Sequence, residues 1–104
     1  MKFGEIFICQ FPFTSGAMSK ARPALVLFDL QRDVLICRIT SAQPAGPLDV
    51  PIIDWLQAGL ALPSVARLDR LVTAERAILG KHLGTPGLRD QVDVRNTWNR
   101  FMVL

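Results

Sequence analysis

Two apolar runs separated by a short polar turn constrain this chain more than any other feature of its sequence. Ala24 to Phe28 and Val34 to Ile39 are rich in residues that suit a buried, pleated surface, and Gln31-Arg32-Asp33 lies between them. Two such runs joined by a tight polar turn are typical of antiparallel strands. The sequence therefore predicts a β-hairpin at this point.

Further strands are predicted on both sides of this hairpin. A run broken by Pro12 precedes it, and the ten residues after Pro12 lack apolar periodicity, which predicts a mobile loop. Asp54 and Gly59 bracket a single predicted helical turn. The expected strands cover residues 5–11, 24–29, 34–41, 49–53, 64–72 and 78–83.

A closing helix is predicted from Pro86 to about Met102. Thr85 provides an N-cap, and proline suits the first helical position because its missing N–H is not needed there. The predicted fold class is mainly β with one C-terminal helix, arranged as a small, strongly curved, half-open barrel. With 104 residues, the chain is expected to form a single domain over 1–104.

Composition excludes several classes of protein. Half of the residues are apolar and a fifth are charged, which argues against disorder, and no apolar run approaches the roughly 20 residues that span a bilayer. The segment from Met1 to Glu5 gains a carboxylate at once and has no apolar core, so it does not read as a signal peptide. We expect a cytoplasmic protein without membrane attachment.

The cysteines and the net charge give weaker signals. Cys9 and Cys37 both fall in apolar runs and are interpreted as small buried hydrophobic residues, because two thiols and the single His82 make no metal site. The net charge of +3 is compatible with a polyanionic partner but does not prove one.

Polar residues at the open end of the hairpin are candidates for RNA cleavage. Internal cleavage uses the neighbouring 2′-hydroxyl as nucleophile, so a base, a cation and an acid suffice without a metal. Arg67 and Asp69 stand two apart on an expected strand and should project to one face. The candidate catalytic residues are Arg22, Thr40, Ser41, Arg67 and Asp69.

Each candidate also has a structural interpretation. Arg67 and Asp69 fit a solvated ion pair. Thr40 and Ser41 fit a turn before a Pro-rich loop, and Arg22 fits the cap of a strand edge. His82 is expected to face solvent, and the two tryptophans are expected to anchor a core or an interface.

Several blocks in register resemble the MazF/PemK toxin family, which includes Kid. These are Gly4-Glu5-Ile6 leading into Phe11-Pro12-Phe13-Thr14, then Arg22-Pro23-Ala24-Leu25-Val26-Leu27 and Ile39-Thr40-Ser41. Gly59-Leu60, the segment from Pro63 to Leu71, and Leu79 to Gly84 with the closing helix continue the likeness over nearly the whole chain.

The resemblance implies an SH3-like barrel and a toxin of a type II toxin–antitoxin system. Such toxins form homodimers and cleave single-stranded RNA, including mRNA, without a metal or other cofactor. They leave 2′,3′-cyclic phosphate and 5′-hydroxyl ends and inhibit translation and growth. A small antitoxin with an acidic tail, of the MazE/PemI kind, is the implied partner.

The resemblance also implies residue roles. Arg22 matches the catalytic arginine of the Arg-Pro motif, Thr40-Ser41 match a pair that contacts the scissile region, and Arg67-Leu68-Asp69 match an Arg-x-Asp acid–base pair. We assign Arg22 to transition-state charge, Asp69 to the base, and Arg67 to the leaving oxygen. The residues expected to bind RNA are Thr14, Ser19, Lys20, Arg22, Gln43 and Arg70, with the loop 15–21 as a lid.

Two departures from the family pattern bear on activity. A loop histidine of Kid-like members is missing near Ala17, and the Gln that often follows Thr-Ser is displaced to Gln43. A catalytically weak RNA-binding member is therefore one alternative. A second alternative is a non-enzymatic inhibitor of a protein target, because the same fold serves the gyrase-poisoning toxin CcdB.

Overall fold

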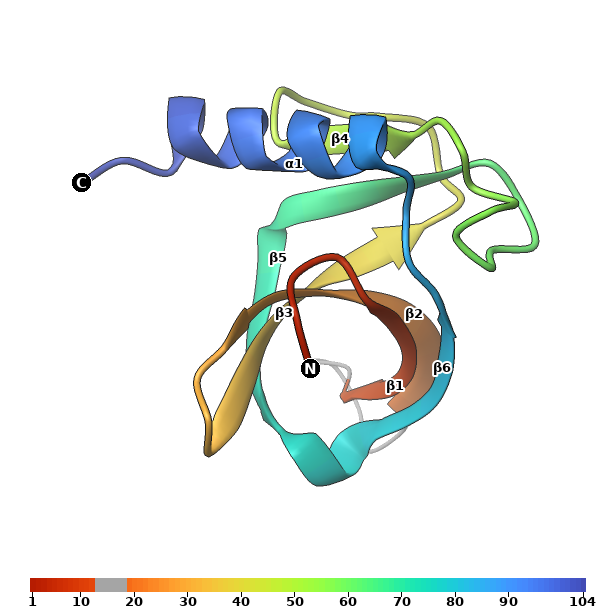
Figure 1. Ribbon diagram of the computed structural model, residues 1–104, viewed down its shortest axis with the longest axis vertical. Helices are drawn as coiled ribbons and strands as arrows, with labels where there is room; N and C mark the ends of the chain where they lie inside the picture. The colour runs from red at the N-terminus through yellow and green to blue at the C-terminus, as the bar shows by residue number, and fades with distance from the viewer. Residues whose placement is uncertain (13–18) are drawn as a thin grey trace.

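The computed structural model describes residues 1–12 and 19–104, and within these ranges the chain forms a six-stranded antiparallel sheet and one α-helix (Figure 1). The strands lie in the order β4-β5-β3-β2-β1-β6. The elements are β1 Ile6–Pro12, β2 Ser19–Asp29, β3 Asp33–Thr40, β4 Asp49–Ile52, β5 Ser64–Glu75, the 3₁₀ turn η1 Arg76–Ile78, β6 Leu79–Gly84 and α1 Leu88–Phe101.

The sheet curls strongly but does not close. Its two outer strands are β4 and β6, and within the described residues each pairs on one side only. Figure 1 shows the strands bending around one another, with α1 crossing on the side of β4. The predicted fold class, a small half-open barrel with a C-terminal helix, is confirmed.

The hairpin predicted from the two apolar runs is β2–β3. Leu25 lies opposite Cys37, and the turn between the strands contains Gln31, whose φ of 72° is unusual for a residue other than glycine. The Asp29 carboxylate accepts a hydrogen bond from the Gln31 N–H at 2.8 Å. Arg76 donates to the Gln31 carbonyl and to Asp29, so the start of η1 holds the hairpin turn in place.

Alternation along the strands gives the sheet two buried faces. On β2, Leu25 and Leu27 belong to a cluster that includes Val94 of the helix. Ala24 and Val26 point to the opposite face and belong to a second cluster, formed from β1, β2, β3 and β5. The helix therefore covers one face, and the sheet curls around the other.

The helix begins two residues later than predicted, at Leu88 rather than Pro86. Gly87 has extended backbone angles and acts as the N-cap, and its carbonyl accepts the first helical hydrogen bond, from Gln91. Asp90 in the first turn is fully buried and accepts the N–H groups of Ile53 and Asp54 at 2.8 and 2.9 Å. A buried carboxylate and two backbone N–H groups thus fix where the helix meets the loop after β4.

The turn that follows β4 and starts at Asp54 ends at Gly59, as predicted. Its φ is +85°, and a Cβ at this position would lie 2.1 Å from the Leu83 carbonyl oxygen. Only glycine fits this close approach. The Ala58 N–H donates to the Asp54 carbonyl, which makes the single helical turn expected there.

Two other expectations are corrected. The loop predicted through residue 22 is too long, because β2 already begins at Ser19 and pairs with β1 from Pro12 onward. The strand predicted over 64–72 continues to Glu75, since its second half pairs with β3 down to Asp33. None of the helices in the described part of the chain is long and apolar enough to cross a bilayer.

Candidate functional site: an arginine cluster across three strands

One pocket contains the first group of predicted residues. Arg22 lies near the start of β2, and Thr40 and Ser41 lie at the end of β3, which runs antiparallel to it. All three residues therefore lie at the same end of these two central strands, where they line a pocket of about 160 Å³. Residues 60–62 and Ser64 form its other walls.

The hydroxyls of this pocket also shape its backbone. The Thr40 Oγ1 accepts a hydrogen bond from the Ala42 N–H at 3.2 Å. As an acceptor, Thr40 therefore has the turn-forming role that its structural interpretation gave it. The Thr40 O–H remains a donor for a ligand. Ser64 donates to the Leu62 carbonyl at 2.8 Å, and Ser41 is exposed.

A second pocket contains the other predicted residues. Arg67, Asp69 and Arg70 line a space of about 220 Å³ whose far wall is the loop 45–49. The regular strand expected here is interrupted, because the partners of β3 jump from Leu71 to Arg67 and leave residues 68–70 as a bulge. Arg67 and Asp69 therefore do not share a face through the regular alternation of a strand, as was expected. Both residues nevertheless line one pocket.

Within the described residues, the ion pair of Arg67 is made with Asp49, not with Asp69. The Arg67 Nε lies 3.9 Å from the Asp49 carboxylate, whose side chain is only 5 % exposed. Asp49 also accepts the Ala45 N–H at 2.7 Å. One buried carboxylate thus orients Arg67 and holds the loop that closes the pocket, while Asp69 remains exposed.

Arg38 was missed by sequence reasoning and lies between the two pockets. It is directly opposite Ala24 on β2 and directly opposite Arg67 on β5. Burial lowers the pKa of the Arg38 guanidinium, and the positive charges of Arg22, Arg67 and Arg70 lower it further. Its signal was a single charge inside an apolar run, whereas Arg22 stands just before one.

Three arginines of this cluster have buried Nε donors without a hydrogen bond among the described residues, and of these only the Arg67 Nε faces a carboxylate, that of Asp49 at 3.9 Å. The other two are the Nε atoms of Arg22 and Arg38. Buried polar groups are almost always paired in folded proteins. Unpaired guanidinium donors in neighbouring pockets can hold an anion, above all a phosphate, whose geometry matches them.

The other residues predicted to bind RNA are more scattered. Gln43 is exposed and lines a third pocket of about 300 Å³ with Trp55, and Arg70 is exposed beside Asp69. Thr14 lies outside the described residues. Ser19 and Lys20 lie in β2, but their side chains are likewise outside what the structure describes.

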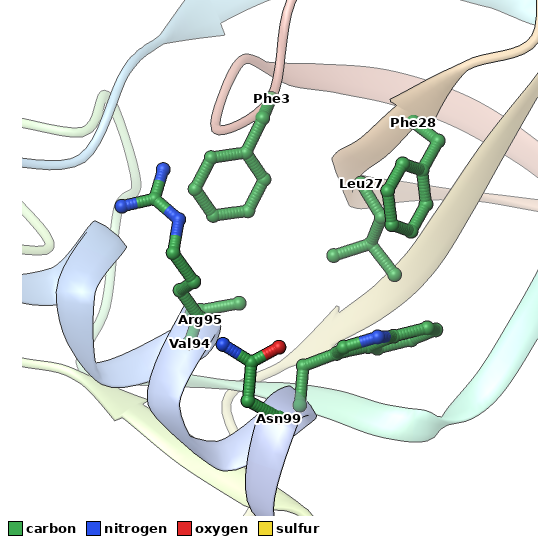
Figure 2. Close-up of a pocket in the computed structure, with 7 residues that line it drawn as sticks. Phe3, Leu27, Phe28, Val94, Arg95 and Asn99 are labelled. Carbon is green, nitrogen blue, oxygen red and sulfur yellow. The ribbon is translucent and has the colours of Figure 1, made fainter. Parts of the chain in front are cut away.

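A larger pocket on the helix side has a different chemistry. Figure 2 shows Phe3, Leu27 and Phe28 facing α1 across a space of about 370 Å³. Arg95 of the helix lies over the Phe3 ring at 5.0 Å. Because most of its lining is apolar, this pocket suits a hydrophobic group and not a phosphate.

The cysteines and His82 lie as predicted. Cys9 and Cys37 are free and buried, and burial raises the pKa of Cys37 to about 12. His82 is exposed on β6, with its ring against Phe7. Within the described residues, no group of three His, Cys, Asp or Glu side chains is arranged to hold a metal ion.

Residues 2–101 match the model of a family described as the PemK-like, MazF-like toxin of type II toxin–antitoxin systems. The structure resembles the Mycobacterium tuberculosis toxin MazF-mt6, with a TM-score of 0.76 and 25 % identity over 96 % of this chain and 98 % of that one.

Two further solved structures share the fold. One is MazF from Deinococcus radiodurans, with a TM-score of 0.74 and 20 % identity over 98 % of this chain and 96 % of that one. The other is an endoribonuclease in complex with its cognate antitoxin from a mycobacterial species, with a TM-score of 0.75 and 18 % identity over 96 % and 92 %. No curated protein sequence matches this chain significantly.

Proposed function

This chain belongs to the family of PemK-like, MazF-like toxins of type II toxin–antitoxin systems, and on that premise we propose that it is a metal-independent endoribonuclease that cleaves single-stranded RNA. Relatives of the same fold are described as endoribonucleases. The observation that carries the proposal is the set of buried arginine Nε donors that have no hydrogen-bond partner among the described residues, at and between the two pockets.

The proposed reaction needs only the side chains of these pockets. Asp69 accepts the proton of a ribose 2′-hydroxyl, and the 2′-oxygen attacks the adjacent phosphorus. The bond from phosphorus to the 5′-oxygen then breaks. The products are a 2′,3′-cyclic phosphate and a 5′-hydroxyl. The 5′-oxygen gains a proton from solvent and Asp69 releases the 2′-proton to solvent, so protons balance and no water is consumed.

The arginines stabilise charge in this reaction. Arg22 supports the charge on the phosphorane oxygens, together with the hydroxyl donors of Thr40 and Ser41. Arg67 stabilises the departing 5′-oxygen, which takes its proton from solvent, since a guanidinium keeps its own proton at ordinary pH. Asp49 acts through Arg67 as a positioning residue, because it pairs with the Arg67 Nε.

Partners follow from the same family membership. We infer that a cognate antitoxin with an acidic segment neutralises the toxin, as a relative of this fold is described in complex with its antitoxin. The net charge of +3 favours such a partner. We further infer a homodimer in the cytoplasm, in which the pockets of the two subunits face one RNA strand.

The direct test is incubation of the purified protein with a long unstructured RNA in EDTA, followed by mapping of the RNA ends. We expect discrete cuts with 2′,3′-cyclic phosphate ends. Arg22→Ala should abolish them, and Arg32→Ala should not, because Arg32 is exposed at the tip of the β2–β3 hairpin.

Two outcomes would contradict the proposal. Intact RNA with a folded protein, tested on several sequences, would favour a non-enzymatic inhibitor of a protein target or a weak RNA-binding member. Cleavage that persists in Arg22→Ala would show that the arginine cluster is not the reaction centre.

A further inference from the structure

Arg38 occupies a central place in a row of residues that crosses four strands. Ala24 on β2, Arg38 on β3, Arg67 on β5 and Asp49 on β4 are successive cross-strand partners. Directly opposed residues of antiparallel strands share a face, with Cβ atoms about 5 Å apart. Arg38 and Arg67 are therefore immediate neighbours on one surface of the sheet.

Arg22 joins the same surface from the other side. It lies two residues before Ala24 on β2, so its side chain projects to the face of Ala24 and Arg38. It is a diagonal neighbour of Arg38, a separation of roughly 7 Å that long side chains bridge easily. Arg38 thus has a guanidinium on each side, one lining each of the two pockets.

This arrangement is unfavourable for the protein alone. Like charges on directly opposed strand positions destabilise a sheet. All the charges that perturb Arg38 are positive, and the ion pair in this row belongs to Arg67 and Asp49. The Arg38 Nε is buried and has no partner among the described residues. A neutral side chain at this position would destabilise the fold less. The charge of Arg38 is therefore better explained by binding of an anionic ligand than by the stability of the fold.

We propose that Arg38 binds a backbone phosphate of single-stranded RNA between Arg22 and Arg67, and so joins the two pockets into one substrate groove. This inference rests on the proposed function, because Arg22 and Arg67 are assigned there to the reacting phosphodiester. An RNA strand that contacts both must pass Arg38. A phosphate is the anion whose oxygens suit several guanidinium groups at once. Arg38 is therefore a substrate-binding residue rather than a base or an acid.

The test uses RNA that cannot be cleaved. The probe is a fluorescent single-stranded RNA with every ribose 2′-hydroxyl methylated, and its affinity is measured by anisotropy over a series of salt concentrations. Each phosphate contact on a single strand contributes about 0.7 to the slope of log K against log salt. We expect Arg38→Gln to lower the slope by about 0.7 and to weaken binding roughly tenfold, as the loss of one charged hydrogen bond does.

Two further variants control the measurement. Arg32→Gln removes the same charge from the exposed hairpin tip and should leave the slope and affinity close to those of the unmodified protein. Arg38→Lys keeps the charge but loses the planar fork, so it should retain the slope and lose part of the affinity. Arg38→Gln should melt no lower than the unmodified protein, because it removes like-charge repulsion, and this shows that it folds.

The outcomes separate this inference from the proposed function. If the protein cleaves ordinary RNA but Arg38→Gln binds the methylated RNA as tightly as Arg32→Gln does, the inference fails and the proposed function stands. If ordinary RNA stays intact while methylated RNA binding still depends on Arg38, the proposed function fails and the inference stands. If Arg38→Gln loses affinity for an acidic peptide but not for RNA, the cluster binds a protein and the inference is wrong.

Discussion

At the scale of single residues, Asp49 has two separable tasks. Its carboxylate pairs with the Arg67 Nε and accepts the Ala45 N–H, and its side chain is almost fully buried. An asparagine at this position keeps an oxygen acceptor for the Ala45 N–H but loses the charge that orients Arg67. An alanine loses both. The two substitutions therefore distinguish the positioning of Arg67 from the support of the loop.

We expect Asp49→Asn to melt close to the unmodified protein and to cleave RNA roughly fivefold more slowly, because an ion pair of this length is worth about 1 kcal/mol. Asp49→Ala should lose activity and also about 0.5–1.5 kcal/mol of the free energy of unfolding, because the hydrogen bond to the Ala45 N–H in an exposed loop is lost. Urea titrations and cleavage rates measure the two effects. Equal activity of Asp49→Asn and the unmodified protein would contradict the positioning role.

From the sequence, a charged residue next to a predicted strand was easier to assign to the site than a charged residue within a strand. Arg22 was found because it precedes an apolar run, and Arg38 was missed because it lies within one. The pleat places Arg38 on the face of Val34 and Ile36, which are buried, so alternation alone predicts a core position. Only the partner strands show that three arginines converge.

At the scale of elements, the turn of the β2–β3 hairpin is held to η1 by the ion pair between Asp29 and Arg76. The hydrogen bond from Arg76, followed by that from the Gln31 N–H, lowers the pKa of the Asp29 carboxyl below its usual value. A carboxyl with a lowered pKa in the folded state stabilises the fold above its unfolded pKa. This contribution is lost as pH falls through the folded value.

We therefore expect Arg76→Gln to lower the melting temperature modestly at neutral pH and to have less effect in acid. The difference between the two proteins should begin to shrink below about pH 4, the pKa of a free aspartate, and should vanish once the pH has fallen below the lowered pKa of Asp29 in the folded protein. Melting curves over a pH series measure this. Arg89→Gln, on the exposed side of α1, is the matched control. A difference that stays constant from neutral to acid pH would contradict the ion pair.

Some element boundaries were predicted correctly from the sequence and others were not, and the difference has a physical reason. The hairpin and the approximate positions of the strands along the chain follow from apolar runs and turn residues, which act locally. The start of α1 at Leu88 depends on Asp90 reaching the loop after β4, and the bulge at 68–70 depends on the pairing of β5 with β3. Both features are set by contacts distant in sequence, which local patterns do not contain.

At the scale of the whole molecule, the charge is distributed in a way that couples folding to ligand binding. The net charge is only +3, but the charges of Arg22, Arg67 and Arg70 all act on Arg38 within one region of the sheet. Their mutual repulsion opposes folding, and a bound polyanion relieves it. A ligand that binds only the folded protein raises its stability according to the ratio of concentration to Kd.

We expect methylated single-stranded RNA to raise the melting temperature by about 10 °C at a concentration of roughly a hundred times its Kd, which corresponds to about 2.7 kcal/mol for a domain of this size. The rise should nearly vanish in high salt, because the contacts are made to phosphates and release counterions. Dextran, an uncharged polymer, is the control for crowding. If RNA and dextran gave equal shifts, or if the shift with RNA survived high salt, the arginine cluster would not be the place where the strand binds. The stabilisation would then come from contacts elsewhere on the molecule.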